Sequence, residues 1–298
     1  MSQSIPNINI KSALAPNPAI AKQNKESNSS LKDFVQETLA LTQRLFIQLQ
    51  RRPSSLIAGI IQPFMWLVLF GALFSKAPAG LFGDDLSYAK FLAPGVIVFT
   101  AFSGALNAGL PIMFDREFGF LNRLLVAPLS SRYSIVAAST IYIIALSFVQ
   151  TAVIIFASAI MGAGLPGLAG LGAIASIVFL IVLGVTALSL GLAFALPGHI
   201  ELLAVIFVTN LPLLFASTAL APLNFMAGWL QIVASLNPLT YAIEPIRYIY
   251  GHAGWAIDSV VMSTPWIGFN FGSVILVLLA FDALILLAIQ PLLRRRFA

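Results

Sequence analysis

The chain has 298 residues, of which 59% are hydrophobic and 9% are charged, and its mean hydropathy is +0.95. A soluble domain carries roughly a quarter charged residues, so the composition excludes a soluble globular protein and indicates a polytopic membrane protein. The absence of cysteine excludes disulfides, thiolate metal sites and a cysteine nucleophile. The net charge of +5 would also suit nucleic-acid binding, but the positions of the basic residues favour another explanation.

The N-terminal fifty residues differ from the rest of the chain. Residues 1–30 are rich in Ser, Asn, Pro and Lys and contain no apolar run, which favours a disordered cytoplasmic tail over a cleavable signal peptide. Apolar residues then recur on one side of a helical pattern over residues 31–52. This stripe predicts an interfacial helix on the membrane surface, and Pro53 turns the chain into the bilayer.

A membrane-spanning helix needs about 20 predominantly apolar residues. Six segments meet this requirement, at residues 57–74, 91–113, 133–161, 168–196, 202–220 and 271–293. We therefore expect an all-α polytopic membrane protein, with one transmembrane domain over residues 31–298. Between the fifth and sixth spans, residues 223–235 and 239–250 are each too short to cross. They predict two exoplasmic half-helices, separated at Asn237.

The basic residues are unevenly distributed between the segments that join the spans. With the N-terminus inside, the inner segments hold thirteen Lys and Arg residues and the outer segments hold three, Lys76, Lys90 and Arg247. Because cytoplasmic segments carry the excess of Lys and Arg, we expect both termini in the cytoplasm and the chain in the plasma (inner) membrane. Topology and attraction to anionic membrane lipids explain the basic surplus, and nucleic acid is not needed.

A charged island lies between the second and third spans, from Phe114 to Arg132. Its apolar residues recur at helical spacing, which predicts one face of a short amphipathic helix. They are Phe114, Phe118, Leu121 and Leu125. Pro128 ends that helix, because proline has no backbone N–H. Such a helix can move both adjoining spans when a partner pushes on it. The alternative is an ordinary polar loop that only sets topology.

This island also resembles a known sequence motif. It contains an acid-Arg-Glu run, a glycine, a Leu-x-Arg-Leu-Leu run and Ala-Pro-Leu, as does the loop between the second and third spans of ABC type-2 (ABC-2) export permeases, particularly those of the daunorubicin-resistance type. A second match, from Asn237 to Arg247, resembles that family's motif before the last span. The resemblance covers the chain from about residue 31 to its C-terminus.

The resemblance implies a dimer of permeases, with a second copy or a paralogue, beside two copies of a cytosolic ABC ATPase. ATP-Mg would bind to that partner, and this chain would hold no cofactor. The island would be the coupling helix that contacts the ATPase, and cargo would pass outward at a dimer interface formed by spans one and five. The implied coupling residues are Asp115, Arg116, Glu117, Gly119, Leu121, Arg123 and Pro128. Phe118 and Phe120 depart from the family, where small or polar residues are frequent.

Further polar residues within the apolar segments are candidates for the exoplasmic side or the pathway: Asn237, Pro238, Glu244, Arg247 and Asp282. Asp282 lies in the middle of the sixth span, where it could face a substrate path or make a structural hydrogen bond. Glu244 and Arg247 are one helical turn apart, which favours an ion pair over an exoplasmic gate.

Other polar residues at the spans have simpler interpretations. Polar residues within transmembrane helices more often hold helices together than contact cargo; in this chain they are Gln62, Asn107, Gln150 and Asn210. His199 and Glu201 lie at the start of the fifth span, where they are expected to be solvated.

The sequence contains no Gly-rich phosphate loop that ends in Gly-Lys-Ser/Thr, so we do not expect the chain to bind ATP or to be an enzyme. The function expected is that of the permease subunit of an ABC exporter, which moves a hydrophobic or amphipathic cargo such as a drug, lipid or glycoconjugate. The alternatives are a secondary transporter or channel without an ATPase, which would usually have more charges at mid-membrane, and a membrane scaffold.

Overall fold

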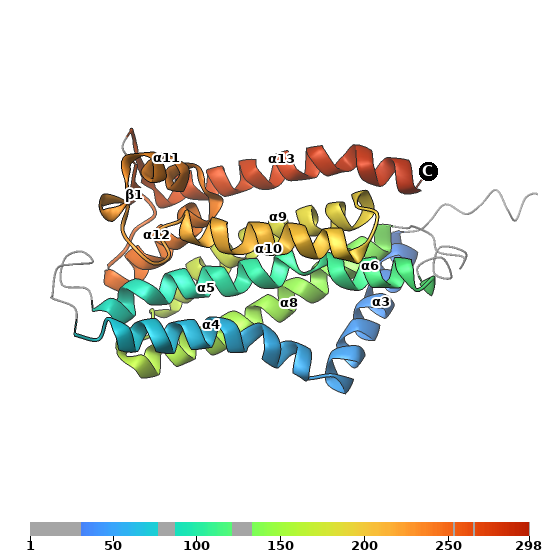
Figure 1. Ribbon diagram of the computed structural model, residues 1–298, viewed down its shortest axis with the longest axis horizontal. Coiled ribbons are helices and arrows are strands. Elements are labelled where there is room, and N and C mark those ends of the chain that lie inside the picture. The colour runs from blue at the N-terminus through green and yellow to red at the C-terminus, as the bar shows by residue number, and fades with distance from the viewer. Residues whose placement is uncertain (1–30, 77–86, 121–132, 253, 265, 298) are drawn as a thin grey trace, which may run out of the picture.

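The computed structural model describes residues 31–76, 87–120, 133–252, 254–264 and 266–297, and most of its helices run along its long axis (Figure 1). The helices are α3 (Leu31–Arg51), α4 (Ser54–Leu73), α5 (Tyr88–Leu106), α6 (Gly109–Glu117), α8 (Tyr133–Ser158), α9 (Leu168–Ala195), α10 (His199–Phe215), α11 (Gly228–Leu236), α12 (Pro238–Gly251) and α13 (Phe271–Phe297). A π-helical turn (Ala159–Ala163) extends α8, and strands β1 (Val260–Ser263) and β2 (Gly268–Asn270) form a hairpin. The predicted tail over residues 1–30 lies outside the described residues.

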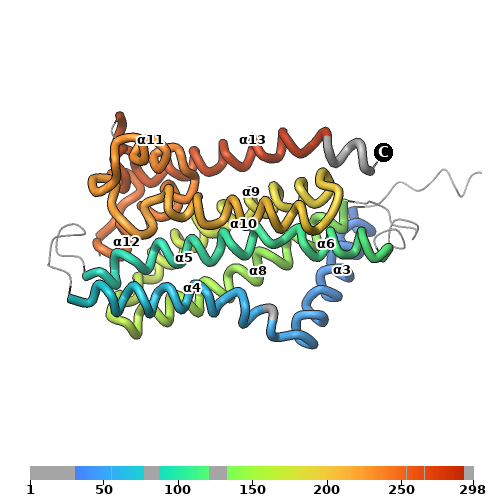
Figure 2. The backbone as a smooth tube through the Cα atoms, in the orientation of Figure 1, coloured from blue at the N-terminus to red at the C-terminus, as the bar shows by residue number. Residues whose placement is uncertain are grey.

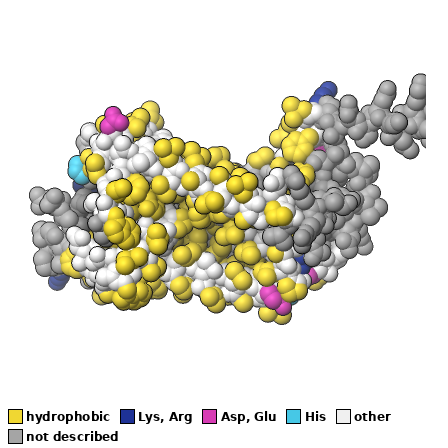
Figure 3. Space-filling model, turned by 90° about the horizontal axis from the view of Figure 1, so that it is seen from above, with side chains coloured by type: hydrophobic (Ala, Val, Ile, Leu, Met, Phe, Trp, Pro, Cys, Tyr) yellow, Lys and Arg dark blue, Asp and Glu magenta, His cyan; other side chains and the backbone are white. Residues whose placement is uncertain are grey.

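The protein is mostly helical and is a multi-pass membrane protein. Among the described residues, five helical segments are long and apolar enough to cross a bilayer: 56–73, 88–117, 133–163, 168–195 and 271–291. α10 is apolar but shorter, so a total of six spans stays a prediction. Figure 3 shows one face on which hydrophobic side chains cover the middle, with charged side chains toward the two ends. A bilayer requires this distribution, because isolated charges are costly in hydrocarbon.

α5 is the central helix. Every residue from 91 to 102 is buried, because α5 packs against α4, α8, α9 and α12. In contrast, α4 and α13 leave large apolar side chains exposed, including Leu69 and Leu284. α3 lies across one end of the bundle at a steep angle to the other helices (Figure 2). The helix predicted over residues 31–52 is therefore present.

The second span, predicted as one helix over 91–113, is divided into α5 and α6. Proline has no backbone N–H, so Pro111 cannot donate to the carbonyl of Asn107, four residues earlier. That carbonyl instead accepts from the N–H of Leu110, three residues on, at 3.1 Å. The tighter turn separates the two helices.

Two other predicted boundaries were wrong, and one element was not predicted. α10 ends at Phe215 and not at residue 220, because the Asn237 side chain binds carbonyls of its last turn, at 2.7 Å from both Leu213 O and Ala216 O. The first half-helix begins at Gly228 and not at residue 223, after a 3₁₀ turn over Leu223–Phe225. The β hairpin was not predicted, because its strands are too short for a sequence period to be recognised.

The close contact between α5 and the segment after α10 generates a test. A Cβ atom added at Gly95 would lie 2.5 Å from the carbonyl oxygen of Ala219, and backbone cannot move aside cheaply. We expect Gly95→Ala to lower the free energy of unfolding by about 1 to 3 kcal/mol, measured by equilibrium unfolding in mixed micelles. Gly172→Ala is the matched control, because a Cβ there meets no atom within 4 Å. Equal stability of the two variants would contradict the packing described.

Candidate functional site

Arg116, near the end of α6, binds the C-terminal end of α9. Its guanidinium donates to the carbonyls of Ala193 at 2.9 Å, Leu196 at 2.5 Å and Pro197 at 2.6 Å. The last carbonyls of a helix have no partner within the helix, and they carry the negative end of the helix dipole. Arg116 therefore satisfies the end of α9 with a positive charge from another helix.

Glu117, the next residue, binds the N-terminal end of α10. Its carboxylate accepts from the backbone N–H of His199 at 2.6 Å and lies 2.5 Å from Nδ1 of the same residue. The N-cap residue of α10 is Gly198, which has no side chain to cap the helix. A Cβ at Gly198 would also lie 3.0 Å from Glu117 Oε1. Gly198 thus leaves space for the Glu117 carboxylate, and that carboxylate supplies the cap that the glycine lacks.

α6 is also joined to α3, though less firmly. Arg44 of α3 lies 3.7 Å from Asp115, and both side chains are about one-third exposed, so the pair contributes little stability. The Arg44 guanidinium also lies 4.2 Å from the ring centre of Phe120. Ser134, at the start of α8, donates to Glu37 of α3 at 3.0 Å. α3 is therefore attached to both helices that border the charged island.

At the opposite end of the bundle, Asn237 joins α10 to α12. Its Nδ2 donates to the carbonyls of Leu213 and Ala216 at the end of α10, and its Oδ1 accepts from the N–H of Leu239 at 2.9 Å, as the N-cap of α12. Pro238 occupies the first position of α12, where a missing N–H costs nothing. One buried amide thus satisfies the ends of two helices.

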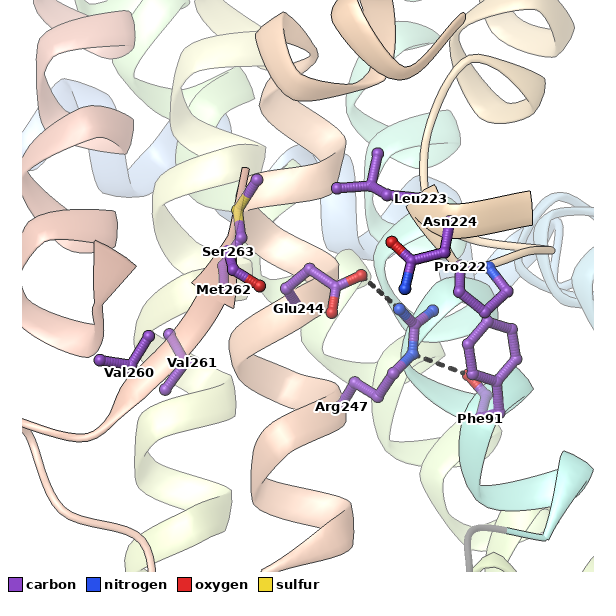
Figure 4. Close-up of a pocket in the computed structure, with 10 residues that line it drawn as sticks. All are labelled: Phe91, Pro222, Leu223, Asn224, Glu244, Arg247, Val260, Val261, Met262 and Ser263. Carbon is purple, nitrogen blue, oxygen red and sulfur yellow. Dashed lines mark hydrogen bonds and ion pairs between the residues drawn. The ribbon is translucent and has the colours of Figure 1, made fainter. Parts of the chain in front are cut away.

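Arg247 of α12 makes the second connection at this end (Figure 4). It forms the ion pair with Glu244 that the sequence predicts, and donates to the carbonyls of Thr218 at 2.5 Å and Phe91 at 3.4 Å. Its guanidinium lies 3.9 Å from the ring centre of Phe91. Phe91, Glu244 and Arg247 line a cavity of about 250 Å³ next to β1. Arg247 therefore holds α12 to α5 and to the segment after α10.

The two networks make α10 a helix that is held at both ends. Glu117 binds its first residue, and Asn237 and Arg247 bind its last turn and the residues that follow. Between these ends α10 is largely open on one side, since Phe207 and Val208 are both 73% exposed. In Figure 1, α10 extends from the α6 end of the bundle to the α12 end.

The structure changes the interpretation of the predicted coupling helix. α6 ends at Glu117, and Gly119 has a φ of +74°, a left-handed conformation that favours glycine. The helix that contains Phe114 therefore does not continue through the island. Phe118 is 81% exposed. The predicted positions Leu121, Arg123, Leu125 and Pro128 lie outside the described residues.

Sequence reasoning missed the roles of Gly198 and His199. It expected His199 to be a solvated terminus, whereas the imidazole pairs with Glu117. No spacing rule could find this pair, because 82 residues separate the partners. Among the described residues, no group of three or more His, Cys, Asp or Glu residues could hold a metal ion.

Asp282 is buried, with 4% of its surface exposed, in the contact between α13 and α9. A Cβ at Gly184 of α9 would overlap its carboxylate, so the glycine makes room for the acid. Within the described part of the chain, neither carboxylate oxygen has a hydrogen-bond partner. The structural hydrogen bond considered from the sequence is therefore not present there.

The Arg247 network generates a stability prediction. Arg247→Met removes three donors and leaves Glu244 without its partner, so we expect a loss of about 3 kcal/mol in the free energy of unfolding. Lys76→Met is the matched control, since Lys76 is exposed at the same end of the bundle. In a double-mutant cycle, Glu244→Gln should cost less in the Arg247→Met background than alone. Additive effects in that cycle would contradict the pairing.

Comparisons with known proteins identify the family. Residues 36–250 match the model of the family described as ABC-2 type transporter. The chain is 50% identical to a putative transport permease, ycf38, of Cyanophora paradoxa, over 94% of this chain and 98% of the relative. It is 54% identical to the corresponding putative permease of Porphyra purpurea, over 89% and 91% of the two chains.

A more distant relative is a probable doxorubicin resistance ABC transporter permease, DrrC, of Mycobacterium tuberculosis, 26% identical over 81% of this chain and 84% of the relative. The family model covers more than half of the chain, and it includes both the α6 end and the α12 network. The resemblance inferred from the two motifs is thereby confirmed: the chain belongs to the ABC-2 type transporter family.

Proposed function

We propose that the chain is the membrane-spanning permease of an ATP-binding cassette exporter. Two copies of a separate cytosolic ATPase would bind ATP-Mg and supply the energy. Family membership and the resistance-transporter names of distant relatives support this assignment. The observation that carries it is the pair of bonds from Arg116 and Glu117 to α9 and α10, because they join the charged island to the membrane core.

The proposed topology has six spans, with α10 as the fifth. Its 17 residues reach about 25 Å at 1.5 Å per residue, somewhat less than the hydrocarbon thickness. The turns after Phe215, together with α11 and α12, would fill the remaining outer part of the hydrocarbon layer. The excess of basic residues supports a topology with the α6 end and both termini in the cytoplasm. The proposed location is the plasma (inner) membrane. α3 would lie on the cytoplasmic surface, in contact with lipid headgroups.

The proposed mechanism is a displacement of α10 by the ATPase. A partner that moves the end of α6 also moves the turn between α9 and α10, because Arg116 and Glu117 are bonded to both sides of that turn. α10 carries the displacement to Asn237 and Arg247, and so to α12. ATPase closure would thus displace α12 at the outer end of the same chain. Small shifts of packed helices are a known way to transmit such a change.

The proposed partner in the membrane is a second copy of this chain or a paralogue. α4 and α10 leave Ile61, Phe207 and Val208 more than half exposed, and the resemblance implies a dimer interface on these spans. A hydrophobic or amphipathic cargo would move outward between the two permeases.

The mechanism separates residues that bind the ATPase from residues that transmit its motion. Phe118 is exposed beyond the end of α6, so Phe118→Ala should reduce the amount of ATPase that co-purifies by severalfold. Glu117 faces α10, so Glu117→Gln should leave the ATPase bound and lower transport at least fivefold. Quantitative pull-down and transport in proteoliposomes measure the two effects.

The matched control is Phe225→Ala, because Phe225 is 61% exposed at the opposite end of the bundle; it should change neither quantity. A purified oligomer that moves solute without any ATPase would contradict the exporter assignment. Normal transport by Glu117→Gln would contradict the route through α10.

A further inference from the structure

A cavity with four amide side chains in a mainly apolar lining lies within the bundle, between the two helix-end networks. It has a volume of about 380 Å³ and lies between α4, α5, α8 and α10, which is within the range of small-molecule sites. Its lining includes the side-chain amides of Gln62, Asn107, Gln150 and Asn210. The sequence favoured separate helix-packing roles for these four residues, whereas the structure brings them together at one cavity.

Gln150 of α8 is the buried end of this cavity. Only 2% of its surface is exposed, and within the described part of the chain its Oε1 has no hydrogen-bond partner. Two glycines make room for the amide: a Cβ at Gly59 of α4 would overlap Nε2, and a Cβ at Gly104 of α5 would lie 3.1 Å from Oε1. An unpaired amide oxygen is costly in a membrane interior, so a polar atom from outside the chain would stabilise it.

Two other amides are held in fixed orientations. Asn210 Oδ1 accepts from the Ser103 hydroxyl at 3.0 Å, and Asn107 Nδ2 donates to the Ser103 carbonyl at 2.7 Å. Gln62 and Asn107 are exposed at the surface of the described structure. The cavity is therefore a recess with an open rim at Gln62 and Asn107 and a buried end at Gln150.

The lining chemistry limits what can bind. Within the described residues it contains no Asp, Glu, Lys or Arg, so an ionised group would lack a counter-charge at this depth. Each amide offers both donors and an acceptor, which suits hydroxyl groups. Ala58, Ile143 and Leu146 supply apolar contacts beside the amides. The best match is an uncharged, hydroxyl-rich group attached to an apolar chain.

We propose that this recess binds the uncharged, polyhydroxylated headgroup of an amphipathic molecule, with Gln150 and Gln62 as hydrogen-bonding residues. Its meaning as a cargo site rests on the proposed exporter function, but the binding itself requires neither ATP nor the ATPase.

The test measures binding to the purified permease in phosphatidylcholine nanodiscs without an ATPase. The probe is a long-chain alkyl glucoside with a diazirine in its chain, and the comparison probe is an alkyl phosphate with the same chain. We expect saturable labelling of α4, α5, α8 or α10 by the glucoside only. Gln150→Leu and Gln62→Leu should each weaken it about fivefold, the loss expected for one hydrogen bond.

Gln290→Leu is the matched control, since it makes the same change at an exposed position of α13, and it should bind the glucoside normally. Because Gln62 is exposed, its replacement tests the proposal even if Gln150→Leu does not fold. Equal labelling by the alkyl phosphate, or equal glucoside binding by all variants, would overturn the proposal. Neither result would affect the ATPase test above, which measures a different interaction.

Discussion

The ends of helices within an apolar environment are the constraint on which this structure depends. Backbone carbonyl and N–H groups at those ends have no intrahelical partners, so each needs a partner from elsewhere. Here the end of α9 and both ends of α10 receive partners from other segments, chiefly Arg116, Glu117 and Asn237. The polar residues of the two family motifs therefore stabilise the fold, whatever further role they have in the mechanism.

This capping has a mechanical consequence. A helix that caps its own ends can shift independently of its neighbours, whereas α10 is bonded to α6 at one end and to α12 at the other. Between its ends, α10 is exposed on one side at Phe207 and Val208 and is bonded on another to Ser103 of α5 through Asn210. The same bonds that stabilise α10 thus provide a continuous connection between the charged island and the opposite end, as the proposed coupling requires.

Polar side chains along the spans have two different environments. Asp282 lies in the close contact between α13 and α9, where Gly184 leaves just enough space for its carboxylate. Gln150 also lies beside two glycines, but at the end of a recess. Both have oxygen atoms without hydrogen-bond partners in the described part of the chain. Of these two positions, Gln150 combines such an atom with space and with further hydrogen-bonding groups, and this difference separates a packing position from a binding position.

The sequence alone determined the membrane class, the approximate helices, the break at Asn237, the Glu244–Arg247 pair and the family, because apolar length, proline placement and one-turn spacing are local properties. The tertiary structure decided which distant groups meet. It ended α10 at Phe215, brought Glu117 to His199, and gathered four amides from separate spans into one recess. Those contacts depend on how helices pack and on where glycines allow close approach, which no local pattern records.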